Sequence, residues 1–150
     1  MSFSQSIRTV WSKYAVFQGR ARRSEYWWWT LFTVIISVIC SALMAATGPS
    51  VVNIVVNGTN VVPTQSQPPG VGYWIAVALT VIVSLALVLP SLAVTVRRLH
   101  DTDRSGWWVL LSLIPVGDIV VLVFLCLAGT VGDNRYGPDP KAQQPPVASL

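Results

Sequence analysis

The densest cluster of chemically active side chains in this 150-residue chain covers residues 97–106. It reads Arg-Arg-Leu-His-Asp-Thr-Asp-Arg-Ser-Gly and contains His100, the one histidine of the sequence. An imidazole beside the carboxylate of Asp101 could transfer protons or bind a metal ion. A metal site, however, usually needs three or four converging ligands, and the sequence has neither a second histidine nor suitably spaced cysteines. The pattern therefore argues against catalysis and metal binding here, and we expect no cofactor.

The arginines of this cluster have two other interpretations. The first is structural, because Arg97 and Asp101 lie one helical turn apart and would pair, while the positive charges orient the chain in a membrane. The second is a binding site, because adjacent arginines form forked hydrogen bonds to the phosphate of an anionic lipid headgroup. A partner protein is the other candidate ligand. The candidate residues for this binding face are Arg20, Arg22, Arg23, Arg97, Arg98, His100, Asp101 and Arg104.

Asp118 is the one ionisable residue inside a predicted membrane span, where an isolated charge is expensive. Such a residue is a candidate for an ion site or a proton relay. It follows Pro115-Val116-Gly117, however, and an aspartate after such a break is well placed to cap a restarted helix with its side chain. We favour the cap over the relay.

The elements that position these side chains are expected to be membrane helices. Hydrophobic residues make up 53% of the chain, charged residues make up 11%, and no charged residue occurs from Tyr26 to Val96. A water-soluble surface would not leave so long a stretch without charge. Three apolar runs have the roughly 20 residues that a helix needs to cross a hydrocarbon core about 30 Å thick. They cover residues 27–46, 74–96 and 107–128. The sequence thus predicts an all-α membrane protein with three transmembrane helices.

The distribution of basic residues predicts the orientation of these helices. Five Lys or Arg residues precede the first run, none lies between the first and second runs, and three follow the second run closely. Because basic residues favour the cytoplasmic side, the N-terminus and the segment after the second helix should be cytoplasmic. Three straight crossings would leave the tail, with Arg135 and Lys141, outside. The third run is broken at residues 115–118, so a re-entrant hairpin that returns the tail to the cytoplasm is the alternative.

Further elements are expected outside the spans. Apolar residues recur at helical spacing from Phe3 to Phe17, which predicts an amphipathic helix that either lies on the membrane or packs against the cytoplasmic loops of its own protein. Valine-rich segments flank Asn57-Gly58, a strong signal for a short extracytoplasmic β-hairpin with a type I′ turn. Residues 1–140 should form a single membrane domain, followed by a flexible tail at 141–150.

Three separated motifs together resemble a known family. Their residues include Gly19, Glu25, Tyr26, Trp27, Ser105, Gly106, Trp107, Asn134, Arg135, Tyr136 and Gly137. In this order the motifs resemble the domain of unknown function 805 family over residues 3–140. The resemblance implies a small multi-pass protein of the bacterial cytoplasmic (inner) membrane with a compact helical fold, and it implies no reaction. Two features depart from the family pattern. Asp103 stands where members often carry Gly or Asn, and the loop over residues 47–72 is longer than in compact members.

The sequence favours a non-catalytic module that binds a partner protein or anionic lipid through its cytoplasmic Arg-rich face. An enzyme is not expected, because no phosphate-binding glycine loop, nucleophile elbow or pair of catalytic carboxylates is present. The alternative is a small transporter or channel subunit that acts as an oligomer, but Asp118 with scattered Ser and Thr is a poor polar lining for one. The expected partners are the lipid bilayer with anionic lipids or another membrane protein, and a homo-oligomer is compatible with the sequence. Basic residues beside the spans rather than along a soluble face argue against nucleic acid.

Overall fold

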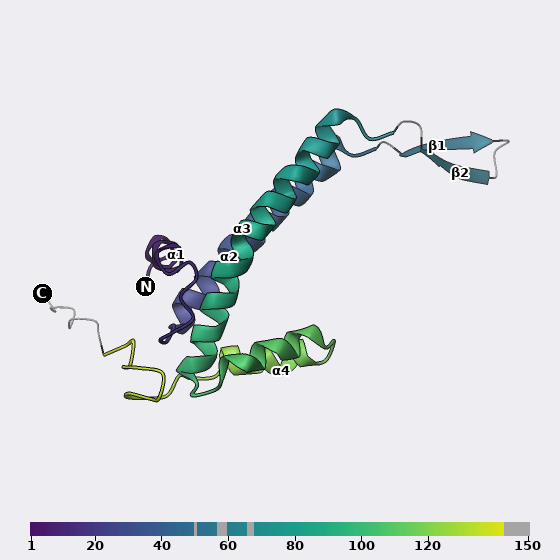
Figure 1. Cartoon of the computed structure of the whole chain (residues 1–150). Coiled ribbons are helices and arrows are strands. Elements are labelled where there is room, and N and C mark those ends of the chain that lie inside the picture. Colours follow the sequence, from purple (N-terminus) through teal and green to yellow (C-terminus); the bar gives the residue numbers. More distant parts are fainter. Residues whose placement is uncertain (50, 57–59, 66–67, 143–150) are drawn as a thin grey trace, which may run out of the picture. The chain divides into compact units, whose positions relative to one another are not determined.

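The computed structural model describes residues 1–49, 51–56, 60–65 and 68–142 of the chain. Figure 1 shows its elements, which are α1 (Phe3–Ser12), α2 (Arg23–Thr47), β1 (Val51–Val56), β2 (Asn60–Gln65), α3 (Val71–Asp101), the 3₁₀-helix η1 (Gly106–Leu113) and α4 (Gly117–Cys126). The chain divides into two compact units. Unit 1 contains Met1–Thr33 and Ala86–Leu150, and unit 2 contains Val34–Leu85.

Helix α1 begins at a capping box. The side chain of Ser2 accepts a hydrogen bond from the backbone N–H of Gln5 at 3.4 Å, and the side chain of Gln5 accepts one from the N–H of Ser2 at 3.0 Å. These two bonds satisfy donors that a helix start otherwise leaves free. The helix ends at Ser12, so the amphipathic helix expected from the sequence is real but stops before Phe17.

The inner face of α1 packs against its own protein. Val10 is buried in one hydrophobic cluster with Trp29 of α2 and Val94 of α3. Phe3 and Trp11 remain exposed on the same helix. The structure therefore packs α1 against helices α2 and α3 of its own protein, whereas the sequence analysis named cytoplasmic loops, and the membrane-surface role stays a prediction.

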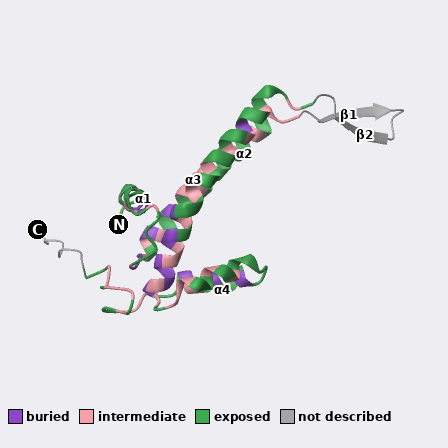
Figure 2. Ribbon diagram, in the orientation of Figure 1, coloured by how far each residue is buried: buried purple, intermediate pink, exposed green. Residues whose placement is uncertain are grey.

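Two helices are long and apolar enough to cross a membrane. They are α2, with 25 residues, and α3, with 31 residues, and they contain the predicted spans at 27–46 and 74–96. Within the described part of unit 2, Ala76 is the one buried residue, and Figure 2 shows most of the rest of this helical segment as exposed or intermediate. Many of the exposed residues are large and apolar, among them Val38, Ile39 and Ile82. Such a surface is favourable in hydrocarbon and unfavourable in water.

A proline inside α3 shows how unit 1 compensates for a missing helical bond. Pro90 has no backbone N–H, so the carbonyl of Ala86 loses the donor that would normally lie four residues later. The hydroxyl of Tyr14, from the segment after α1, donates to this carbonyl at 2.7 Å. The long helix therefore continues past the proline while the N-terminal segment is tied to it.

Unit 2 also contains the two strands. Strands β1 and β2 pair antiparallel, from Val51 opposite Gln65 to Val56 opposite Asn60. They use the valine-rich segments, whose β-branched residues favour extended backbone. The turn predicted at Asn57-Gly58 lies outside the described residues.

The structure does not confirm a third transmembrane helix over residues 107–128. The segment forms two arms, η1 and α4, with the break near Pro115 that the sequence predicts. Helix α4 has 10 residues, about half the number that crosses a hydrocarbon core. The N–H of Thr130 donates to the carbonyl of Asp101 at 2.8 Å, so the segment between them starts and ends at one place. A straight third crossing cannot have both of its ends there.

The two arms are held by a second hydrophobic cluster in unit 1. Leu99 at the end of α3 packs with Val121 and Leu125 of α4. Tyr26 contacts this cluster and the cluster around Trp29, so it joins the two halves of the unit 1 core. The remaining faces of η1 and α4 are largely exposed and carry mostly apolar side chains.

Candidate functional site

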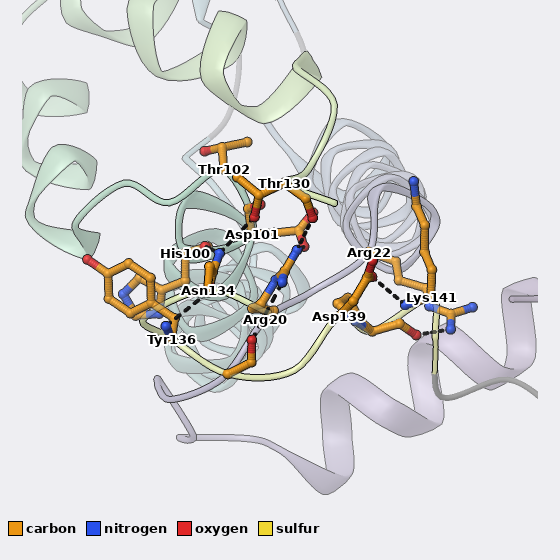
Figure 3. Close-up of polar contacts among 12 residues, drawn as sticks. Arg20, Arg22, His100, Asp101, Thr102, Thr130, Asn134, Tyr136, Asp139 and Lys141 are labelled. Carbon is orange, nitrogen blue, oxygen red and sulfur yellow. Dashed lines mark hydrogen bonds and ion pairs between the residues drawn. The ribbon is translucent and has the colours of Figure 1, made fainter. Parts of the chain in front are cut away.

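Three charged side chains from distant parts of the sequence meet at the C-terminal end of α3. We call Arg20, Arg98 and Asp101 the ion-pair node, part of which Figure 3 shows. The Nε of Arg20 donates to Oδ1 of Asp101 at 2.9 Å, and Nη1 of Arg98 donates to Oδ2 of the same carboxylate. The three side chains are 1%, 0% and 5% exposed, respectively. Because an isolated buried ion pays a desolvation penalty of several kcal/mol, each charge here depends on the others.

The remaining donors of the two arginines bind backbone carbonyls of the chain that follows η1. Arg20 donates from Nη1 to the carbonyl of Gly132 and from Nη2 to that of Thr130, both at 2.6 Å. Arg98 donates from Nε to the carbonyl of Leu125 at 3.1 Å and from Nη2 to that of Leu127. The last carbonyls of a helix lack intrahelical partners, and a cation there also complements the helix dipole. The node thus fixes the end of α4 and the tail to α3.

A second buried ion pair lies beside the node. Nη1 of Arg97 donates to Oε1 of Glu25 at 2.8 Å, which joins α3 to the start of α2. The prediction that Arg97 pairs with Asp101 is therefore wrong. Although their spacing permits contact, Asp101 is already held by Arg20 and Arg98, and Glu25 of the neighbouring helix satisfies Arg97 instead. Nε and Nη2 of Arg97 have no hydrogen-bond partner among the described residues.

The histidine of the cluster has an aromatic partner rather than an acidic one. The rings of His100 and Tyr136 stack with centroids 3.9 Å apart and planes 3° from parallel. Nδ1 of His100 lies 3.3 Å from the carbonyl oxygen of Gly19. Across the described ranges, no three His, Cys, Asp or Glu side chains are grouped so that they could hold a metal ion. The geometry gives His100 a role in fixing the tail.

The C-terminal motif closes the same junction. Nδ2 of Asn134 donates to the carbonyl of His100 and to Oγ1 of Thr130, both at 2.9 Å (Figure 3). Oδ1 of Asn134 accepts the N–H of Tyr136 at 2.9 Å, which shapes the turn that carries the stacked ring. On the surface, Arg135 pairs with Asp103 at 3.1 Å, with both side chains about half exposed. The three motifs of the sequence therefore meet in one place.

Local backbone geometry explains the other motif residues. Oγ of Ser105 accepts the N–H of Trp107 at 3.4 Å and caps η1. Gly106 has no room for a side chain, because a Cβ there would lie 2.6 Å from Cγ1 of Val96. Asp103 has a φ of 56°, in the left-handed region that Gly and Asn favour.

Three of the candidate arginines lie outside both buried ion pairs. Arg22 and Arg23 line a space of about 280 Å³ together with Arg98 and Lys141, and we call it the basic cleft. Nη2 of Arg22 donates to the carbonyl of Pro140, and Nε of Arg23 donates to that of Leu127 at 2.9 Å. The guanidinium carbon of Arg104 lies 3.7 Å from the ring centroid of Phe124, so it stacks on α4.

Asp118 does not cap α4 in the way the sequence predicts. The helix starts one residue earlier, at Gly117, its N-cap is Val116, and no side chain bonds to the free amides of the first turn. Asp118 stands inside that first turn, where its charge complements the helix dipole. At Gly117 the two arms approach so closely that a Cβ would overlap the carbonyl of Leu111 in η1. A residue without a side chain is therefore needed where α4 begins.

Sequence reasoning missed residues that contribute through their backbone. Thr130 and Gly132 offer carbonyls to Arg20, and at Gly129 a Cβ would overlap the carboxylate of Asp101. A glycine beside a small polar residue has no distinctive pattern in one sequence. The pairing of Arg20 with Asp101 was also missed, because 81 residues separate them and no local spacing rule applies.

Comparisons with known proteins identify a family and relatives of this chain. The family described as "Protein of unknown function (DUF805)" matches residues 14–138. Inner membrane protein YhaH of Escherichia coli (strain K12) is 41% identical over 135 residues, which cover 89% of this chain and 94% of that protein. Inner membrane protein YhaI of the same strain is 40% identical over 134 residues, with coverage of 89% and 92%. No solved structure matches significantly. The chain, with its two apolar helices of spanning length and its three converging motifs, belongs to the DUF805 family of membrane proteins.

Proposed function

We propose that the protein is a non-catalytic membrane module that binds anionic phospholipid headgroups at its Arg-rich end. The basic cleft is the observation that carries this proposal. Four cationic side chains, those of Arg22, Arg23, Arg98 and Lys141, line about 280 Å³ of space, enough for a phosphate group and part of its headgroup. Asp101 is the one acid that lines the cleft, and its carboxylate is already shared by two arginines. The local charge is therefore positive.

The charge distribution of the whole chain supports a membrane-surface ligand. All ten Lys and Arg and all six Asp and Glu residues fall within unit 1, so the net charge of +4 is concentrated there. A basic residue near an anionic membrane surface contributes about 1 kcal/mol of attraction. By the positive-inside bias this end faces the cytoplasm, where a bacterial membrane presents anionic headgroups.

The buried ion pairs reduce the set of candidate residues for ligand binding that the sequence analysis gave. Arg20, Arg97 and Arg98 hold the fold together, and their side chains are almost fully buried. Arg22, Arg23 and Lys141 belong to no ion pair within the described ranges, and each keeps donors that the chain does not use. Headgroup binding is thus assigned to these three residues, with Arg98 contributing its charge.

Lipid retention by the purified protein tests this proposal. We expect native mass spectrometry of the detergent-solubilised protein to show retention of phosphatidylglycerol over phosphatidylcholine. Each of Arg22→Gln and Lys141→Gln should weaken phosphatidylglycerol binding about 5-fold, the equivalent of roughly 1 kcal/mol per charge.

Arg8→Gln is the matched control, because Arg8 is an exposed arginine of α1 that does not line the basic cleft. It should retain phosphatidylglycerol like the unmodified protein. Equal retention of the two lipids, or an equal loss in the Arg8 variant, would reject a specific headgroup site and favour a partner protein as the ligand of this face.

A second candidate function, a small transporter or channel subunit, is favoured by one observation. A cavity of about 400 Å³ in unit 1 is lined by Asp118 together with the hydroxyl-bearing Ser91, Thr95 and Ser112. Intramembrane carboxylates beside hydroxyl groups are typical of ion and proton pathways. We rank this function second because Asp118 is the one carboxylate that lines the cavity.

A further inference from the structure

The segment between α3 and the tail forms a hairpin whose two ends are tied together. The backbone bond from Thr130 to Asp101 joins its flanks at 2.8 Å, and Arg98 binds the carbonyls of Leu125 and Leu127 at the end of α4. The node therefore returns the chain to the end of α3 from which it left. Whichever side of a membrane holds Asp101 also holds the start of the tail.

The length of each arm matches half of a bilayer. Arm η1 has 8 residues, which span about 16 Å at the roughly 2.0 Å rise of a 3₁₀-helix. Arm α4 has 10 residues, which span about 15 Å at the 1.5 Å rise of an α-helix. A hydrocarbon core is about 30 Å thick, so each arm reaches roughly to its middle.

The surface of the hairpin fits acyl chains rather than water. Large apolar side chains at and near the tip are exposed, with Leu113 at 80%, Val116 at 69% and Ile119 at 62%. Two backbone amides of the tip are paired within it, because the N–H of Ile114 donates to the carbonyl of Leu111 at 3.0 Å and that of Gly117 donates to the carbonyl of Ile114 at 2.8 Å. Pro115 has no N–H to satisfy. Each such pair lowers the cost of placing backbone in lipid.

The hairpin also lies beside α3 at depth. Asp118, next to the tip, lines the same cavity as Ser91 and Thr95 of α3. Ser91 precedes Asp101 by ten residues, which is about 15 Å along an α-helix. This distance agrees with the length of the arms.

From these observations we infer that η1 and α4 form a re-entrant hairpin that inserts into one leaflet of the bilayer, with acyl chains as its partner. The chain then crosses the membrane twice, through α2 and α3, and the tail lies on the same side as α1. The basic residues of the tail, Arg135 and Lys141, join the other basic residues on that side, as the positive-inside bias favours. The inference does not depend on headgroup binding at the basic cleft.

Cysteine accessibility in vesicles of known orientation tests the inference. Single cysteines are introduced by Lys13→Cys, Val116→Cys and Val131→Cys in a background in which Cys40 and Cys126 are replaced by Ala. Lys13 marks the side of α1, and Val131, which is 96% exposed, marks the tail. A membrane-impermeant maleimide should label both of these from the same face. Position 116 should react from neither face until detergent is added.

Three results would overturn the inference. Labelling of positions 13 and 131 from opposite faces would show a third crossing. Labelling of position 116 from the face of position 13 would place the hairpin on the membrane surface, and labelling from the other face would place its tip across the bilayer.

If the Val116 variant does not accumulate, Leu113→Cys replaces it, because the side chain of Leu113 is 80% exposed and packs little against the protein. A nitroxide at the chosen position should be accessible to oxygen and protected from a water-soluble nickel complex.

Discussion

The ion-pair node and the tip of the hairpin each contain an aspartate, and the two aspartates differ in burial and in ion pairing. At the node, Asp101 is 5% exposed and accepts hydrogen bonds from two arginines. At the tip, Asp118 is exposed, stands in the first turn of α4 and has no ion-pair partner in the described ranges. The comparison shows that the buried charges of the sequence cluster form ion pairs, whereas Asp118 forms none within the described ranges. A dense polar cluster between two spans is thus weak evidence for a ligand until its internal pairs are known.

The largest effect is expected from Asp101→Asn. The substitution keeps the size of the side chain but leaves Arg20 and Arg98 buried without a counter-charge, and breaking a buried pair in this way costs about 3–5 kcal/mol. The free energy of unfolding, measured in mixed micelles with an increasing fraction of SDS, should fall by that amount. We also expect the tail to become sensitive to protease, because Arg20 would no longer hold the carbonyls of Thr130 and Gly132.

Asp103→Asn is the control for this variant. Asp103 pairs with Arg135 on the surface, with side chains 46% and 60% exposed, and such pairs contribute about 0–1 kcal/mol. Asn also tolerates the left-handed backbone found there. If the two variants lost similar stability, the node would not be the buried charge centre that the geometry indicates.

An intermediate effect is expected from Gly129→Ala, which tests the close approach of the chain to the node. A Cβ at this position would overlap the carboxylate of Asp101, so the tail or the carboxylate must move. Overpacking of this kind costs about 1–3 kcal/mol. Gly70→Ala is the control, because no atom lies within 4 Å of a Cβ placed there. Unfolding in the same micelles should separate the two variants, and equal stability would show that the tail does not press against Asp101.

Much of the fold could be predicted from the sequence because it depends on local patterns. Runs of apolar residues at 27–46 and 74–96 identified α2 and α3, and proline followed by glycine identified the break between η1 and α4. The end of α1 was predicted five residues too late, because the apolar periodicity continues to Phe17 although the helix stops at Ser12. Apolar run length alone also suggested a third span, since it does not record that the two ends of the run are tied together.

The candidate site was only partly predictable, for a physical reason. The residues themselves were identified, because charge is rare in this chain and its clusters stand out. Their partners were not, since the pairs Arg20 with Asp101 and Arg97 with Glu25 join different helices and loops. The spacing rule for neighbours on one helix suggested an ion pair between Arg97 and Asp101. That rule does not consider partners from other segments, which only the tertiary fold brings close.

The smallest effect is expected from Asp118→Asn. No ion pair is lost, the helix-dipole contribution of a first-turn acid is about 0.3–1 kcal/mol, and removal of a charge from lipid offsets part of it. The free energy of unfolding should therefore change by less than about 1 kcal/mol, in contrast to the same substitution at Asp101. A loss as large as at the node would mean that Asp118 has a partner that stabilises the fold, such as a second copy of the chain.

Proton flux into vesicles, followed with a trapped pH-sensitive dye, provides the functional measurement for the same variant. Ser112→Ala, which changes another residue of the same cavity, is the control. If flux were present and only the Asp118 variant abolished it without loss of stability, the transporter candidate would replace headgroup binding as the leading function.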